Sequence, residues 1–144
     1  MKTCTRRIQF CAGHRVHGHE SKCSNLHGHN YVAFITAEAT DLDEVGRVID
    51  FSVLKSEVGG WIDDYWDHGM ILKETDPALA AVKATPSCAN GSQKLYVMRE
   101  NPTAENMAAH LLSVAGPLLH RFGVAPTKVV LWETENCYAE AVRP

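Results

Sequence analysis

The feature that most constrains this chain is the segment CSNLHGHNY at residues 23–31. Side chains two residues apart lie on the same face of a strand, so a strand through this segment directs His27 and His29 to one side. Two imidazoles in that position can share one metal ion, and His14 offers a third upstream. Catalytic zinc usually takes three protein ligands and keeps a fourth position open. The other interpretation is that these histidines are polar residues of a strand and its loop.

Composition places the chain among ordinary globular proteins. It has 144 residues, 45% of them apolar and 22% charged, which predicts a single domain over residues 1–144. The net charge of −3 gives no electrostatic basis for binding nucleic acid. No apolar run approaches the roughly 20 residues of a membrane-spanning helix, and none follows the charged start of the sequence as in a secretory signal. Five irregularly spaced cysteines argue against a disulfide framework, so we expect a cytoplasmic protein.

Alternating apolar residues predict two strands in the first part of the chain. Ile8 and Phe10 alternate with polar residues in the range 3–13, and a second strand is predicted over 27–39. The polar residues between these ranges are typical of a loop. Two strands joined by so short a connection are most simply antiparallel neighbours. Such pairing can bring His14 close to the two later histidines.

The rest of the chain predicts helices and two further strands at its end. The order of elements indicates an α+β domain with helices on one face of a four-stranded antiparallel sheet. The predicted elements are a helix after the N-cap Asp50 that ends near Tyr65 and is weakened by Gly59-Gly60, a short helix at 78–82, an exposed loop at 85–92, a short strand at 94–98, a long helix from Thr103 to Phe122 with a kink at Gly116-Pro117, and strands at 128–133 and 138–142.

One cysteine has a setting that suits chemistry. A thiol near a cation or a metal has its thiolate favoured and can act as a base or a nucleophile. Cys23 lies in a polar loop just before the histidine pair, and we assign it this role rather than that of a small buried residue. We expect the other cysteines to be buried packing residues, namely Cys4, Cys11, Cys88 and Cys137.

Acidic residues beside other polar groups give further candidates. Asp67 could tune or orient His68, a possible proton shuttle, although adjacent side chains often point apart. Glu133 ends an apolar run. If its carboxylate faces inward, it needs paired N–H donors such as the amidine edge of a pterin. The other interpretation is a solvent-facing residue at the end of a strand. Thr103 and Glu105 also have an ordinary account as the N-cap and first-turn acid of the long helix.

Several stretches of the sequence occur in the order of one known family. They are FCAGH at 10–14, Cys-x3-HGHNY at 23–31, GRVIDF at 46–51, DH at 67–68, and PTAEN at 102–106 with WET at 132–134. Together they cover nearly the whole chain and resemble the 6-pyruvoyl-tetrahydropterin synthase family. The three-residue gap between Cys23 and His27 is similar to that of its bacterial 6-carboxy-tetrahydropterin synthase branch. The sequence departs from the family pattern at Gly69 and in a longer excursion over 78–92, which bears on product specificity.

The resemblance implies a fold, an assembly and a set of residue roles. The fold is the tunnelling fold (T-fold), whose ββααββ units assemble into rings with barrel-shaped sheets. The assembly is a homohexamer of two trimers with active sites between subunits. The implied roles are zinc binding by His14, His27 and His29, proton abstraction by Cys23, a relay by Asp67 and His68 that is often supplied by a neighbouring subunit, and catalysis and pterin anchoring by Glu133, with Thr103 and Glu105 also at the substrate.

The activity that the resemblance implies belongs to the carboxy branch. Zinc acts as a Lewis acid on the side-chain hydroxyls of 7,8-dihydroneopterin triphosphate, triphosphate is eliminated, and side-chain cleavage releases acetaldehyde and leaves a 6-carboxylate for queuosine biosynthesis. No redox cofactor is required. One alternative is the 6-pyruvoyl product, formed by eliminating triphosphate only; another is a non-catalytic pterin- or metal-binding module. The candidate cations for the triphosphate are Arg15, Lys22, Lys55 and Arg99.

Overall fold

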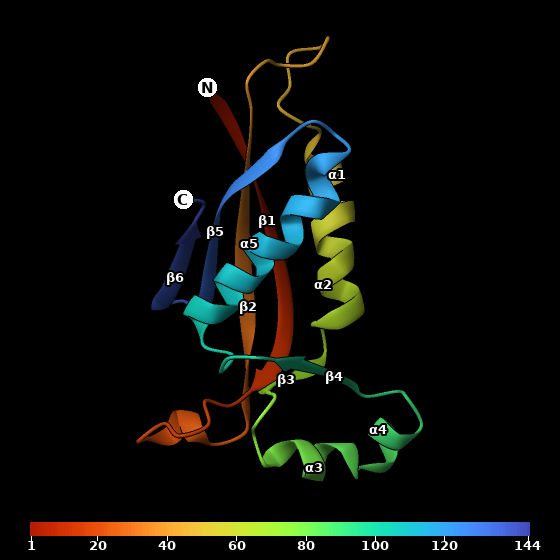
Figure 1. Cartoon of the computed structure of the whole chain (residues 1–144), viewed down its shortest axis with the longest axis vertical. Coiled ribbons are helices and arrows are strands. Elements are labelled where there is room, and N and C mark those ends of the chain that lie inside the picture. Colours follow the sequence, from red (N-terminus) through yellow and green to blue (C-terminus); the bar gives the residue numbers. More distant parts are fainter.

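A pair of long antiparallel strands forms the centre of the computed structural model, which describes the whole chain, residues 1–144 (Figure 1). β1 spans Lys2–His14 and β2 spans His27–Ala39. They pair along their full length, so that His14 lies directly opposite His27. The two predicted strands are confirmed to within a residue at each end. Their ends carry the predicted histidines to one place, at the lower end of the sheet in Figure 1.

The sheet has six strands and is mixed, so the predicted four-stranded antiparallel sheet is wrong. Its order is β4-β3-β1-β2-β5-β6, with β3 parallel to both β1 and β4 and the other neighbours antiparallel. A five-residue apolar run such as GMILK does not reveal its own partner, and contacts distant in sequence decided where β3 pairs. The remaining strands are β3 (Gly69–Lys73), β4 (Lys94–Met98), β5 (Ala125–Thr134) and β6 (Cys137–Val142).

Helices cover one face of this sheet, as predicted for an α+β domain. Figure 1 shows α5 crossing the sheet, with the helix formed by α1 and α2 beside it. No helix is both long and apolar enough to cross a membrane. The helices are α1 (Phe51–Leu54), the π-helical segment η2 (Lys55–Gly59), α2 (Gly60–Tyr65), α3 (Ala78–Lys83), α4 (Pro86–Ala89) and α5 (Ala104–His120), with a 3-10 turn, η1, at Lys22–Ser24.

One local prediction differs from the structure, and the predicted kink at Gly116-Pro117 stays a prediction. The range 85–92 was predicted as loop, yet it contains α4, because the Thr85 hydroxyl accepts a hydrogen bond from the Cys88 amide and caps the helix. α5 continues through Pro117 to its end at His120. Proline removes one hydrogen bond from a helix, and burial of the apolar side of α5 against the sheet maintains the helix there.

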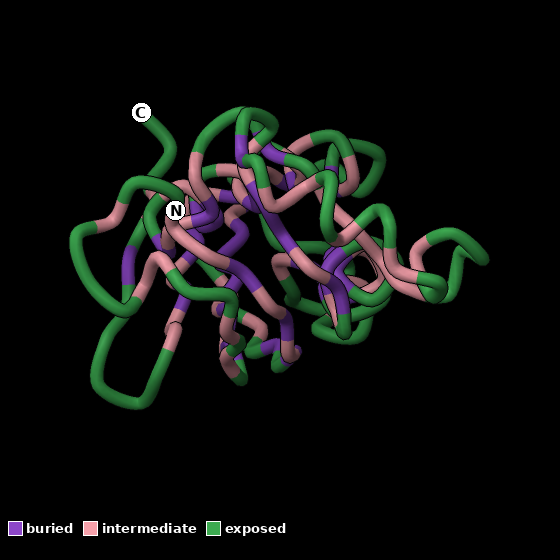
Figure 2. Tube along the Cα trace, turned by 90° about the horizontal axis from the view of Figure 1, so that it is seen from below, coloured by how far each residue is buried: buried purple, intermediate pink, exposed green.

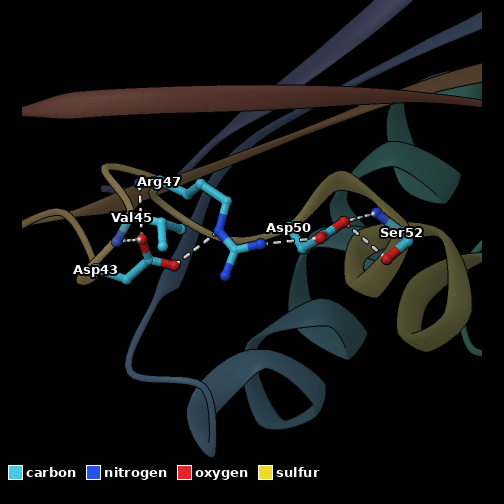
Figure 3. Close-up of polar contacts among 5 residues, drawn as sticks. All are labelled: Asp43, Val45, Arg47, Asp50 and Ser52. Atoms are coloured by element: carbon cyan, nitrogen blue, oxygen red, sulfur yellow. Dashed lines mark hydrogen bonds and ion pairs between the residues drawn. The ribbon is translucent and has the colours of Figure 1, made fainter.

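The loop between β2 and α1 is organised by charged side chains (Figure 3). Arg47 bonds to Asp43 at 2.9 Å and to Asp50 at 3.1 Å. Asp43 also accepts from the backbone amides of Val45 and Arg47. Asp50 accepts from the Ser52 amide at 2.8 Å, so the predicted N-cap of α1 is confirmed. These ion pairs are half exposed and define the shape of the loop more than they stabilise the fold.

The core lies between the helices and the inner face of the central strands. Alternate residues of β1 and β2 point into it, and buried segments gather at the centre of the chain trace in Figure 2 while the loops are exposed. Phe10 and Tyr31 stack there with ring centroids 5.1 Å apart. The inward-facing residues of β1 continue past Phe10 and Ala12 to His14, which is only 1% exposed. The core therefore continues directly into the histidine cluster.

Candidate functional site

Three histidines and one glutamate meet where β1, β2 and β5 lie side by side. One ligand atom from each of His14, His27, His29 and Glu133 lies within 4.8 Å of the others. The Nε2 atoms of His14 and His27 are 3.1 Å apart. Glu133 Oε1 lies 2.9 Å from His29 Nε2 and 3.8 Å from His14 Nε2. The structure thus brings the three predicted metal ligands together and adds Glu133 to them; we call these four residues the His/Glu group.

Hydrogen bonds on the far side of two rings define their tautomers. Nδ1 of His14 lies 2.6 Å from the carbonyl oxygen of Pro102, and Nδ1 of His27 lies 2.6 Å from that of Asn25. A carbonyl oxygen only accepts, so both Nδ1 atoms carry hydrogen and donate. The neutral rings then present Nε2 lone pairs to each other at 3.1 Å. Two facing lone pairs are favourable only with a cation or a proton between them, so this arrangement suits a metal ion.

His29 completes this donor set. Its Nε2 is buried and has no hydrogen-bond partner, because Glu133, although close, lies outside hydrogen-bond geometry. Burial lowers the pKa of both His14 and His29, with Glu133 opposing the shift. The imidazoles are therefore kept in the neutral form that binds metal. Three imidazoles with one carboxylate beside them fit zinc among the divalent ions.

Tyr31 is a neighbour of the His/Glu group that the sequence analysis did not single out. Its ring lies edge-on to His29, with centroids 5.5 Å apart, and its hydroxyl is buried without a partner. Burial and the nearby Glu133 carboxylate raise the pKa of this phenol, so it stays protonated. Strand alternation was the signal available, because Tyr31 follows His27 and His29 in steps of two.

Asp67, His68 and Cys11 form a second cluster. His68 Nδ1 donates to Asp67 Oδ2 at 2.8 Å, so the two adjacent side chains do meet. They meet because His68 has φ 59°, a left-handed backbone conformation that no other non-glycine residue of this chain adopts. Cys11 Sγ lies 3.5 Å from His68 Nε2. Burial raises the pKa of Asp67, but hydrogen bonds from the Cys11 amide and from His68 outweigh it and lower the pKa overall.

Two of the cysteines expected to be buried packing residues differ clearly from that prediction. Cys137 is exposed, and the other is Cys11. It is half-buried and lies against His68. Strand alternation could have shown this, because Ile8, Phe10 and Ala12 face the core and Cys11 must face the other way.

The two clusters lie on opposite faces of the sheet. Directly opposite residues of an antiparallel pair share a face. His29 is opposite Ala12 on the helix-covered face, whereas Cys11 is opposite Asn30 on the open face. A pocket of about 430 Å³ reaches both clusters, because its lining includes Cys11 and His68 as well as His29. In one chain, the ligand atoms of the His68 cluster and those of the His/Glu group thus form two separate sets.

Cys23 lies in the short turn η1, close to His27 in sequence. The carbonyl of Cys23 accepts from the Val16 amide at 2.8 Å, while its half-buried thiol makes no hydrogen bond in the chain. Arg15 braces this loop through two hydrogen bonds to Asp76, whose side chain is fully buried. Arg15 is thus already paired with a carboxylate within the chain.

The two candidates at the start of α5 have structural positions. The Thr103 hydroxyl accepts from the Asn106 amide at 3.1 Å and caps the helix. Glu105 is exposed and makes no polar contact in the chain. The link from α5 to the His/Glu group is the Pro102 carbonyl, which holds the His14 ring.

Comparison with known proteins identifies the family. The family model described as 6-pyruvoyl tetrahydropterin synthase matches residues 3–144. The chain belongs to this family. A relative from Rickettsia bellii named 6-carboxy-5,6,7,8-tetrahydropterin synthase is 43% identical, covering 97% of this chain and 99% of the relative. A relative of the same name from Rickettsia typhi is 45% identical over the same shares.

Solved structures agree with the fold of this family. An uncharacterized protein from Wolinella succinogenes superposes with a TM-score of 0.85 at 22% identity, over 99% of this chain and 98% of that one. The 6-pyruvoyl tetrahydropterin synthase of Plasmodium falciparum superposes with a TM-score of 0.69 at 16% identity, over 99% of both chains. The family's α+β fold is therefore that of this chain.

Proposed function

We propose that this chain is a zinc-dependent 6-carboxy-5,6,7,8-tetrahydropterin synthase. It would convert 7,8-dihydroneopterin triphosphate to 6-carboxytetrahydropterin, acetaldehyde and triphosphate, as a lyase of queuosine biosynthesis. The observation that carries the proposal is the convergence of free imidazole nitrogens beside Glu133, with the far side of two rings held by carbonyl oxygens. The relatives that bear this enzyme's name match 97% of the chain, which supports the same assignment.

The residues of the chain divide into roles around a substrate. Zinc held by His14, His27 and His29 would supply Lewis-acid chemistry toward the substrate's hydroxyl oxygens. Cys23, in the turn before His27, takes a proton from a side-chain carbon of the substrate. Glu133 has one carboxylate oxygen beside His29, and the other makes no hydrogen bond or ion pair in the chain, so it can accept from a pterin N–H.

Proton return is assigned to the Asp67–His68 pair. Asp67 holds Nδ1 of His68, so Nε2, which lies 3.5 Å from Cys11 Sγ, is the ring nitrogen that accepts or delivers a proton. Because this pair and the His/Glu group lie on opposite faces of the sheet, the pair that serves one metal group comes from a neighbouring copy of the chain. This is consistent with a homo-oligomer, for which we propose the homohexamer of two trimers.

The test is a product assay. The zinc-loaded protein is incubated with 7,8-dihydroneopterin triphosphate, and mass spectrometry follows the pterin products and acetaldehyde, with chelator-treated protein as the control. We expect 6-carboxytetrahydropterin and acetaldehyde in equal amounts. A 6-pyruvoyl product without acetaldehyde would replace the carboxy assignment with the other branch of the family. Binding of substrate without any turnover would show a non-catalytic module.

A further inference from the structure

Lys94 connects strand β4 to the backbone that carries the Asp67–His68 pair. Its ammonium donates to the carbonyl oxygen of Asp67 at 2.6 Å and also to that of Asp63 in α2. Lys94 is opposite Gly69 in the parallel pair of β3 and β4. Figure 1 shows these two strands side by side near the end of α2. One half-buried cation therefore joins the last turn of a helix to the residue just before His68.

The backbone at His68 needs such support. A left-handed conformation is unfavourable for a residue with a Cβ and persists only where surrounding contacts hold it. On one side, β1 holds it, because the His68 amide donates to the Cys11 carbonyl at 2.7 Å and the Cys11 amide donates to Asp67 Oδ1 at 3.0 Å. Lys94 holds the same segment from the other side, through the Asp67 carbonyl.

Gly69 makes this approach possible. A Cβ at Gly69 would lie 3.1 Å from Lys94 Cβ and 3.0 Å from the Trp66 carbonyl oxygen. Both distances are tighter than ordinary contacts, so a residue with a Cβ would force Lys94 and the Trp66 carbonyl to shift by a few tenths of an ångström. Gly69, which departs from the family pattern, thus leaves room for the lysine that lies opposite it on the neighbouring strand.

We propose that Lys94 is a positioning residue, which holds the Asp67–His68 pair in the geometry needed for proton transfer. The proposal rests on the proposed function, because it gives His68 the relay role. In this chain, the Lys94 ammonium donates to backbone carbonyls only. Its positive charge also favours the ionised form of Asp67, the form that accepts from His68.

The test replaces Lys94 in the full-length, zinc-loaded protein. Lys94→Met keeps the apolar stem and removes the ammonium, and we expect kcat to fall by about 10²-fold, with zinc content and KM near wild type. Hydrogen exchange at the His68 amide should become at least about tenfold faster, because its hydrogen bond opens more often. Lys94→Arg should recover most of both losses. Lys73→Met is the matched control, since Lys73 is a half-buried strand lysine whose side chain makes no hydrogen bond or ion pair.

Each outcome decides the proposal. Unchanged His68 exchange in Lys94→Met overturns it, whatever the activity. Equal losses in Lys73→Met overturn it as well, because a general strand effect would then explain them. If Lys94→Met does not fold, Lys94→Gln, which lacks the ammonium, must show the same faster exchange. If the wild type proves inactive on the pterin substrate, the proposed function fails, while the exchange measurement still tests whether Lys94 holds His68.

Discussion

At the scale of single residues, the site depends on which ring nitrogen is occupied. Nδ1 of His14 donates to the Pro102 carbonyl oxygen, and Nδ1 of His27 donates to that of Asn25. The Nε2 atoms of both rings therefore face each other with their lone pairs. Those carbonyls are not recognisable in a sequence motif. They nevertheless hold the rings in the tautomer and orientation that a metal ion needs.

Loss of one imidazole should abolish tight metal binding. We expect His29→Ala to lower the zinc content from about one per chain to well below half after dialysis, because catalytic zinc sites use three protein ligands. Inductively coupled plasma mass spectrometry measures this directly. His17→Ala is the control, since His17 is exposed and its ring makes no hydrogen bond. Full zinc content in His29→Ala would remove His29 from the ligand set.

The proposed base should be separable from the metal ligands. Cys23→Ala is expected to lower kcat by at least about 10²-fold, the lower range for loss of a general base, with unchanged zinc content. Turnover and metal analysis on the same preparation measure both. Cys137→Ala, at an exposed cysteine of β6, should match wild type. Loss of zinc together with activity would mean that Cys23 is a ligand, and retained activity would assign the base elsewhere.

At the scale of elements, one ion pair joins two loops around the site. Arg15 follows β1, and Asp76 precedes α3 while accepting from the Ala78 amide. Neither sequence pattern nor periodicity relates residues this far apart. The pair connects the loop that carries Cys23 to the excursion between β3 and β4. The excursion is thus part of the structure that supports the site.

Breaking this pair should destabilise the protein in a pH-dependent way. Asp76→Asn is expected to lower the free energy of unfolding by about 2 kcal/mol near neutral pH, because a buried charged hydrogen-bond partner is lost. Arg15 lowers the pKa of Asp76 below its usual 3.8. This stabilisation is therefore complete above the unfolded-state pKa and disappears as pH falls through the folded one.

Urea unfolding of wild type and variant across the acid range measures this difference. The gap between the two proteins should shrink below about pH 4. Asp64→Asn, at an exposed carboxylate of α2, should change stability little at any pH. A gap that stays constant with pH would show that the ion pair is not its cause.

At the scale of the whole molecule, the separation of the two clusters has a consequence for activity. The His/Glu group and the Asp67–His68 pair lie on opposite faces of one sheet, so we expect active sites to be completed between copies of the chain. Mixed oligomers test this. Inactive Cys23→Ala and His68→Ala chains, unfolded and refolded together, should recover part of the wild-type activity.

Activity recovers only at those interfaces where the two different chains meet. In a random mixture, some interfaces combine an intact Cys23 from one chain with an intact His68 from the next. Size-exclusion chromatography with light scattering establishes that mixed oligomers have formed. No recovery in mixtures of proven composition would place both residues of a site on the same chain.

The sequence by itself determined the two central strands, the N-caps at Asp50 and Thr103, and the candidates His14, His27 and His29. These are local properties, because alternation and capping depend on residues within a few positions of one another. The family resemblance rested on the same short motifs, and the family model confirmed it.

Only the tertiary structure decided the parallel pairing of β3 and β4, the contact of Cys11 with His68, and the partners of Arg15 and Lys94. Each joins segments that are far apart in the chain, and their free energy comes from packing and hydrogen bonds formed only after the sheet assembles. A short strand pattern fits several partners equally well. The physical reason for the division is the range of the interactions: local preferences are visible in a sequence, whereas long-range contacts depend on the whole fold.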